Sequence, residues 1–192
     1  MKRLTFLMLM LALALMLGGT ALAQGDNSVY FVTYFANANT ANAPDATLRA
    51  VNDGDTGGNL YASIYVFDDS EELTQCCSCQ ITPDGLLSES VNKNLTANPI
   101  TGIKPTRGVI KLISSATEDD ANTSFASNTP TAGIRAWATA VQKLTSGFQL
   151  TETPLADANL ASGEQSLLQL LCYYDKLLSG KPCTCTPEDS DF

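Results

Sequence analysis

Six cysteines are the residues in this chain with the most evident chemistry. They form two groups of three: Cys76, Cys77 and Cys79 in a CCSC run, and Cys172, Cys183 and Cys185 near the C-terminus. Thiols in such groups form disulfides, bind thiophilic metals or act as redox pairs. Adjacent residues of a strand point to opposite faces, and the CCSC run lacks the C-x2-C spacing that brings two sulfurs to one zinc ion. We therefore predict disulfides, with a thiolate metal site or a redox pair as the alternative.

The two cysteine groups favour bridges over long range. A bond between the neighbours Cys76 and Cys77 would strain the backbone. We expect each cysteine of the first group to pair with one of the second, which encloses loops of about 100 residues. A single disulfide closing such a loop stabilises a fold by at most about 5 kcal/mol. These bridges would fasten the C-terminal segment to the CCSC run.

The chain has no histidine, although it has 20 acidic residues. Without histidine, Ser-His-Asp and Cys-His catalysis and most zinc and copper sites are excluded. Carboxylate-pair and Ser-Lys mechanisms stay open in principle, but no particular pair of residues stands out. We predict that the protein is not an enzyme and requires no cofactor.

Two weaker patterns offer ligand sites. Asp53, Asp55 and Asn59 lie in a Gly-rich turn and offer oxygen atoms to calcium. Ile64 stands at the twelfth position of this stretch, where an EF-hand has glutamate, so the hypothesis is a looser calcium site. A carbohydrate-binding face could be lined by Trp137 with Tyr61, Tyr65, Tyr173 and Tyr174. A plain turn and ordinary packing of the aromatic side chains are the alternative interpretations.

Residues 1–23 have the three parts of a secretory signal peptide. Lys2 and Arg3 give a positive start, and residues 4–17 form an apolar run. Ala21 and Ala23 then form an A-x-A motif, which predicts cleavage before Gln24. The apolar run is shorter than the roughly 20 residues of a membrane-spanning helix. We expect a secreted or periplasmic protein that is not inserted in a membrane after cleavage.

The mature chain is acidic. Cleavage removes two basic residues and no acidic one, which changes the formal net charge from −9 to −11. Proteins bind nucleic acids through clustered lysine and arginine, and this sequence has no such cluster. We therefore exclude nucleic acid as a partner.

Strand patterns dominate residues 24–160. Val29 to Phe35 is β-branched and aromatic, as in a strand buried on both faces. The stretch from Leu60 to Phe67 alternates, which predicts that Leu60, Ala62, Ile64 and Val66 share one face. Further strands are expected at 46–51, 109–113 and 148–153, with a long loop at 114–133. Residues 134–144 fit either a strand or a helix.

A tight turn is predicted at Pro83, Asp84 and Gly85, an x-P-D-G-x pattern in which proline presets the first corner. The strands predicted on either side, residues 75–82 and 86–91, would then form a hairpin.

One amphipathic helix is predicted over residues 163–178. Ser162 and Gln165 have the spacing of a capping box, and Gly180 is expected to end the helix. An apolar stripe that requires a covering surface is formed by Leu167, Leu170, Leu171, Tyr174, Leu177 and Leu178. Together these patterns predict an antiparallel β-sandwich, Ig-like or similar, over 24–160. The helix at 161–180 would pack on it, followed by a Cys-containing acidic tail at 181–192.

Part of the sequence resembles uncharacterised exported proteins of environmental bacteria. The similarity rests on residues 59–87, where a YVFD strand precedes a CC-x-C run and a TPDGL turn, and on the later RAWAT segment at 135–139. The resemblance implies a bacterial source and export. It implies no activity, ligand or catalytic residue.

These observations predict a secreted, non-catalytic structural or surface protein, and in particular a self-assembling extracellular subunit. Residues Val29 to Phe35 lie close to the mature N-terminus, where an apolar strand could add to the sheet edge of a second copy. A carbohydrate- or calcium-binding module is the alternative. A Cys-ligated metal or redox protein is a second alternative.

Overall fold

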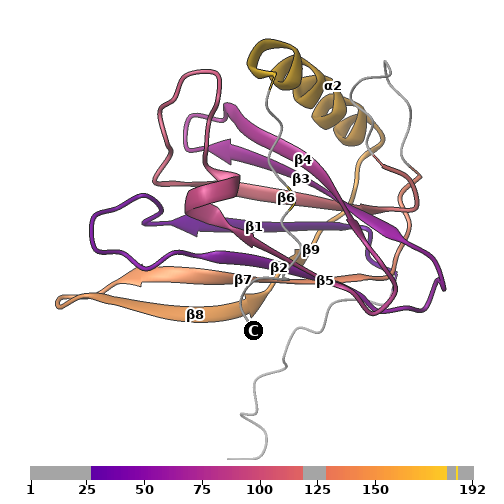
Figure 1. Ribbon diagram of the computed structural model, residues 1–192, viewed down its shortest axis with the longest axis horizontal. Coiled ribbons are helices and arrows are strands. Elements are labelled where there is room, and N and C mark those ends of the chain that lie inside the picture. Colours follow the sequence, from indigo (N-terminus) through magenta and orange to yellow (C-terminus); the bar gives the residue numbers. More distant parts are fainter. Residues whose placement is uncertain (1–26, 119–128, 181–184, 186–192) are drawn as a thin grey trace, which may run out of the picture.

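Two antiparallel β-sheets pack face to face, and one helix lies across the outside of the larger sheet (Figure 1). The computed structural model describes residues 27–118, 129–180 and 185. The larger sheet has the order β4-β3-β6-β1-β9 and comprises Leu73–Ile81, Leu60–Asp68, Arg107–Ser115, Tyr30–Ala36 and Ala156–Asp157. The smaller sheet has the order β5-β2-β7-β8 and comprises Leu86–Ser90, Thr47–Asn52, Ile134–Lys143 and Phe148–Pro154. The predicted fold class is confirmed.

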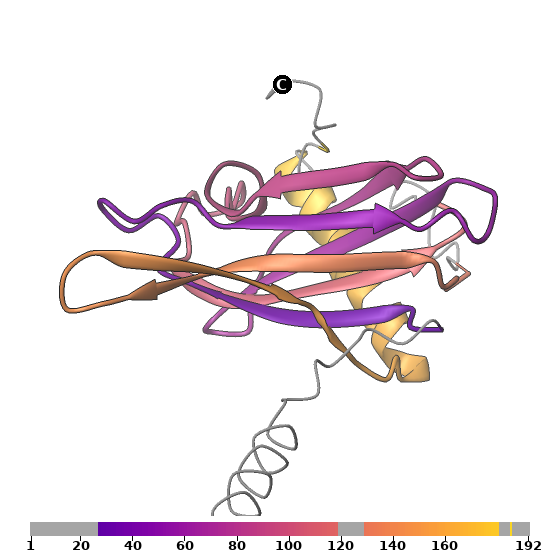
Figure 2. The same cartoon turned by 90° about the horizontal axis from the view of Figure 1, so that it is seen from below.

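The core lies between the two sheets. Figure 2, seen from below, shows strands β5, β2 and β7 of the smaller sheet side by side, with α2 behind them. Strand β3 contributes every second residue to the core, and the predicted inward face is confirmed for Leu60, Ala62, Ile64 and Val66. Strand β6 adds Ile110 and Leu112 from the same sheet, and β2 and β7 add Leu48 and Ile134 from the opposite sheet. The alternation of side chains along a strand is therefore what fills the space between the layers.

Strand β1 confirms the expectation of a strand at Val29 to Phe35, with bounds shifted by one residue. Phe31 and Phe35 face the core. On the other face, Tyr30 is buried under the helix, whereas Tyr34 is 64% exposed. Strand β1 pairs along its whole length with β6, while β9 pairs only with Phe31 and Val32.

The hairpin predicted around Pro83 to Gly85 is wrong. The turn is present, and Asp84 adopts positive φ there, but it carries the chain from β4 in the larger sheet to β5 in the smaller one. Strand β4 instead forms its hairpin with β3, around the acidic segment that follows Asp68. Turn chemistry specifies a local reversal of the chain and does not specify which sheet receives the next strand.

Residues 134–144, which fitted either a strand or a helix, form strand β7, because they pair with β2 and β8 in the middle of the smaller sheet. The loop expected at 114–133 lies partly outside the described residues. Its described ends are joined by a bridge between Ser115 and Pro130. A short π-helix, η1, spans Val91–Leu95 and leads from β5 towards β6.

The predicted helix is α2, Ser162–Ser179, which ends at Gly180 in the left-handed conformation as expected. The predicted capping box is wrong, because Ala161 occupies the N-cap and its side chain cannot accept a capping hydrogen bond. The predicted covering of the apolar stripe is also wrong. Helix α2 contacts the sheet through Leu168 and Cys172, and most of the stripe faces solvent. Periodicity establishes that a stripe exists but does not identify the side of the helix that is covered.

We expect Gly108→Ala to destabilise the protein by on the order of 3 kcal/mol. Gly108 lies in β6 opposite Phe35, and a Cβ at this position would overlap the Phe67 carbonyl oxygen and lie 2.9 Å from two ring carbons of Phe35. The matched control is Gly163→Ala in the first turn of α2, where no heavy atom lies within 4 Å of the added carbon. This control should stabilise by up to about 1 kcal/mol. Equal denaturant midpoints for the two variants would contradict this account of Gly108.

Candidate functional site

Two disulfides fasten the C-terminal part of the chain to strand β4. Cys76 is bonded to Cys172 in α2, and Cys79 is bonded to Cys185 in the tail, with Cα separations of 5.7 and 5.4 Å. Cys76 lies on the outer face of the sheet with the helix, whereas Cys79 lies on the inner face with the main core. The alternation along β4 therefore lets one short CCSC run hold two segments on opposite faces. Both bridges join the first cysteine group to the second, as predicted.

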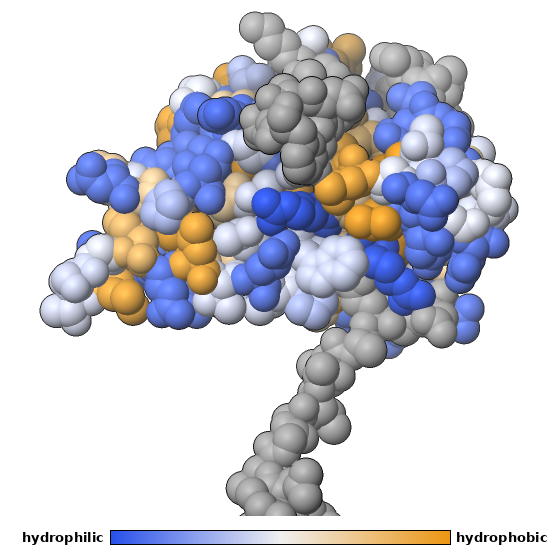
Figure 3. All heavy atoms as spheres, turned by 60° about the horizontal axis from the view of Figure 1, so that its bottom comes forward, coloured by the Kyte–Doolittle hydropathy of each residue, from blue (hydrophilic) through white to orange (hydrophobic). Residues whose placement is uncertain are grey.

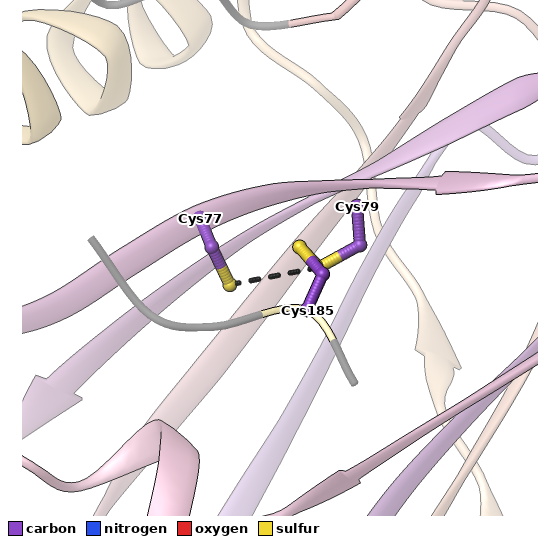
Figure 4. A group of neighbouring side chains, drawn as sticks. All are labelled: Cys77, Cys79 and Cys185. Atoms are coloured by element: carbon purple, nitrogen blue, oxygen red, sulfur yellow. Dashed lines mark hydrogen bonds between the residues drawn. A yellow bond between two sulfur atoms is a disulfide. The ribbon is translucent and has the colours of Figure 1, made fainter. Parts of the chain in front are cut away.

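A third sulfur lies beside the second bridge. The sulfur of Cys77 is 3.9 Å from that of Cys79, and the sulfurs of Cys77, Cys79 and Cys185 lie within 4.8 Å of one another (Figure 4). Cys77 is also disulfide-bonded, and no cysteine in the described part of the chain is free. Cys183 lies outside the described residues. Metal ligation requires thiolates, and these bonded sulfurs cannot supply them, so the contact between Cys77 and Cys79 is a van der Waals contact.

The exposed surface of α2 is apolar. Four large apolar side chains are half or more exposed: Leu167 at 50%, Tyr174 at 51%, Leu177 at 64% and Leu178 at 70%. The side of the helix that faces the sheet includes two polar side chains, Gln169 and Asp175, beside Leu168 and Cys172. An amphipathic helix normally buries its most apolar side. Here the disulfide of Cys172 holds the less apolar side of the helix against the sheet and leaves the more apolar side exposed.

A groove of about 400 Å³ runs beside this surface, between α2 and the larger sheet. Leu167 and Leu171 line it from the helix, and Phe67 and Val109 line it from the sheet. Tyr34 lies next to Val109 on the neighbouring strand and extends the apolar floor. By contrast, the face turned forward in Figure 3, which includes the side of β7 and β8, carries its apolar residues in separate patches among polar ones.

Two charged residues, Lys111 and Glu164, also line the groove. The Glu164 carboxylate accepts hydrogen bonds from Lys111 Nζ at 2.5 Å and from the Tyr30 hydroxyl at 3.1 Å. The Lys111 ammonium also lies 5.1 Å from the centre of the Phe67 ring. These contacts attach the first turn of α2 to strands β1 and β6, so the helix is held at its N-terminal end by an ion pair and just past its middle by the disulfide of Cys172.

The pKa values of Glu164 and Tyr30 are both shifted further from neutral pH. The hydrogen bond from Lys111 lowers the pKa of Glu164, and burial together with the negative charge of Glu164 raises the pKa of Tyr30. A general acid or base works best with a pKa near the operating pH. The cluster of Tyr30, Lys111 and Glu164 therefore fits a structural role.

Asp175 is a carboxyl group buried beneath α2. Only 3% of the residue is exposed, and its Oδ1 has no hydrogen-bond partner among the described residues. Its Oδ2 lies 3.8 Å from the sulfur of Cys76, which carries no hydrogen because it is disulfide-bonded. Burial raises the pKa of Asp175 to about 6, although the charge of Lys176 opposes the shift. Sequence reasoning missed this residue, since no local pattern marks it as buried.

The proposed calcium ligands are only partly brought together. The Asp53 carboxylate already lies 3.3 Å from Arg135 Nε and accepts a hydrogen bond from the Asp55 backbone. Asp55 and Asn59 are exposed at the surface of the turn. Arg135 neutralises one of the charges that a calcium ion would need, so this geometry favours a plain turn.

The aromatic residues proposed to bind carbohydrate do not form one surface. Trp137 lies in the smaller sheet, whereas Tyr61 and Tyr65 lie in the larger one. Tyr173 and Tyr174 are on α2, with their rings in edge contact at 5.6 Å.

Comparison with known proteins adds no family. No protein-family model matches the sequence, and no curated protein matches it. Among solved structures, the chain is similar to the crystal structure of Thermotoga maritima 1070, with 14% sequence identity and a TM-score of 0.43. That similarity covers 72% of this chain and 100% of the other. Within the described ranges, no helix is both long and apolar enough to span a membrane.

We expect Asp175→Asn to remove a pH-dependent loss of stability. The pKa of Asp175 rises from 3.8 to about 6 on folding. The protonated carboxyl therefore makes its full contribution to the free energy of unfolding below about pH 4, and this contribution is lost as the pH rises through 6. Two pH units correspond to at most about 3 kcal/mol. The difference in unfolding free energy between wild type and variant, measured by urea titration from pH 4 to 7.5, should change by up to that amount. A constant difference would contradict the burial of this carboxyl.

We expect peptide mapping of the oxidised protein to recover three linkages. Two are Cys76 to Cys172 and Cys79 to Cys185. Because Cys77 is also bonded, the third should join Cys77 to Cys183. The intact mass should be six hydrogens below that of the fully reduced chain. Bound zinc with intact thiols would instead support the metal alternative.

Proposed function

We propose that this protein is an exported, non-catalytic structural subunit that works outside the cytoplasm and associates with further copies of itself. The observation that carries the proposal is the exposed side of helix α2, where Leu167, Tyr174, Leu177 and Leu178 meet solvent. The other side of the helix is bonded to the sheet through Cys172. A monomeric protein exposes such side chains singly, whereas a contiguous apolar surface is typical of an interface.

The disulfides support a location outside the cytoplasm. Bonds such as those of Cys76 and Cys79 form and persist in oxidising compartments and are rare in the cytosol. The apolar start of the chain supports the same location, with cleavage before Gln24. The sequence resemblance supports a bacterial source.

The association surface that we propose differs from the strand favoured by the sequence. In β1, Phe31 and Val32 pair with β9, and the Tyr30 carbonyl accepts a hydrogen bond from Ala158 just beyond it. Among the described residues, the stretch from Thr33 to Ala36 has no strand on this side, which leaves a short edge for a second copy. Strand β8 is a longer edge, and most of its residues are exposed. Neither edge presents as much apolar side-chain surface as α2, and we therefore assign the association to the helix.

The proposal is tested on the mature protein with its disulfides intact. Its molar mass, measured by light scattering and sedimentation over a wide concentration range, should rise with concentration above that of one chain. Electron microscopy of concentrated samples then distinguishes closed oligomers from filaments. A strict monomer whose melting temperature rises with calcium or a glycan would overturn the proposal in favour of the binding module.

A further inference from the structure

We propose that two copies of this chain associate through α2, each helix lying antiparallel to the other and entering the groove of the opposite copy. The inference rests on the proposed function and specifies its interface. It follows from the positions of the exposed apolar residues around the helix, from the groove beside them, and from the distribution of charge.

Helix geometry divides the exposed residues into two sets. Leu168, Cys172 and Asp175 mark the side that faces the sheet. With 3.6 residues per turn, Leu177 lies roughly half a turn from them, pointing away from the sheet, and Tyr174 lies between that direction and the side. Three further side chains point sideways, towards or alongside the groove: Leu167, Leu171 and Leu178.

This arrangement is complementary to itself. If a second copy is placed by a two-fold axis that passes level with Cys172 and Tyr173, the sideways residues of the two helices meet, with Leu167 opposite Leu178 and Leu171 opposite Tyr174. The outward residue Leu177 then faces the floor formed by Phe67, Val109 and Tyr34 in the other copy. In such an isologous pair, the exposed side of α2 in each copy fills the apolar groove of the other copy.

Charge favours a second copy over a charged partner. No charged residue occurs between Glu164 and Asp175 in α2, and Glu164 is already paired with Lys111. A basic protein would require an acidic surface, whereas the exposed side chains of α2 between Glu164 and Asp175 carry no charge. Asp68 and Glu71 also line the groove, so the like charges of two acidic copies would approach each other there. Added salt should therefore strengthen the pair.

The size of the surface predicts a concentration-dependent dimer. A helix of 18 residues is roughly 27 Å long. Together with the adjoining strands the surface is roughly 20 Å wide, because a helix is about 10 Å across and strands are about 4.8 Å apart. The resulting area, on the order of 500 Å² per copy, lies at the lower end for specific interfaces.

The test combines single variants with a charge pair. Leu178→Glu and Leu167→Lys should each weaken dimerisation by about tenfold or more, because each places a charge in the apolar contact. The double variant, Leu167→Lys with Leu178→Glu, should recover a large part of that loss. Within one chain these positions are about 16 Å apart along the helix, so the two new charges can pair only between copies. Sedimentation equilibrium on the oxidised mature protein measures each dissociation constant.

The matched control is Leu150→Glu in β8, on the other sheet, where the wild-type side chain is 49% exposed. It should leave dimerisation unchanged. Circular dichroism and the intact disulfide mass establish that every variant is folded, and Leu178, at 70% exposed, is unlike a core position.

If Leu178→Glu has no effect or Leu150→Glu dissociates the dimer, the interface is overturned while self-association stands. If the double variant shows no recovery, the antiparallel arrangement is overturned. If wild type is monomeric throughout, the proposed function fails as well.

Discussion

The alternation of side chains along strand β4 is the constraint on which the rest of the structure depends. Cys76 points outward and is disulfide-bonded to Cys172 of α2. Cys79 points inward and is disulfide-bonded to Cys185 of the tail. Because neighbouring residues of a strand face opposite ways, both attachments come from one short run of sequence. A small sandwich of this size can bury a substantial core by itself, so the bridges act mainly on the segments that the sandwich does not enclose.

The attachment of α2 determines which of its side chains meet solvent. Without the disulfide, burial of the leucine side of the helix would be favoured. In this structure Gln169 and Asp175 lie against the sheet instead. The disulfide between Cys76 and Cys172 limits the orientations in which the helix can pack. It also lowers the conformational entropy of the unfolded chain. This arrangement also buries the Asp175 carboxyl, whose Oδ1 has no hydrogen-bond partner within the described ranges, and that burial costs free energy.

The sequence predicted what depends on short-range pattern. The strands, the inward face of β3 and the long-range disulfide pairing follow from period-2 alternation and from the compartment. The turn at Asp84 was predicted, but its sheet crossing was not, because local turn chemistry contains no information on the partner of the next strand. The exposed stripe of α2 and the burial of Asp175 depend on tertiary contacts, for which the helical period gives no direction.

The bridge from Cys79 to Cys185 also affects how the molecule would respond to mechanical tension. It closes a loop across a sequence separation of 106 residues, or roughly 360 Å of extended chain. Force applied at the two ends bypasses this loop, because the covalent bond carries it directly. Strands β1, β2 and β3 precede Cys79 and can be drawn out, whereas α2 lies within the closed loop. In a molecule pulled from its two ends, helix α2 therefore stays inside the part of the chain that cannot be extended.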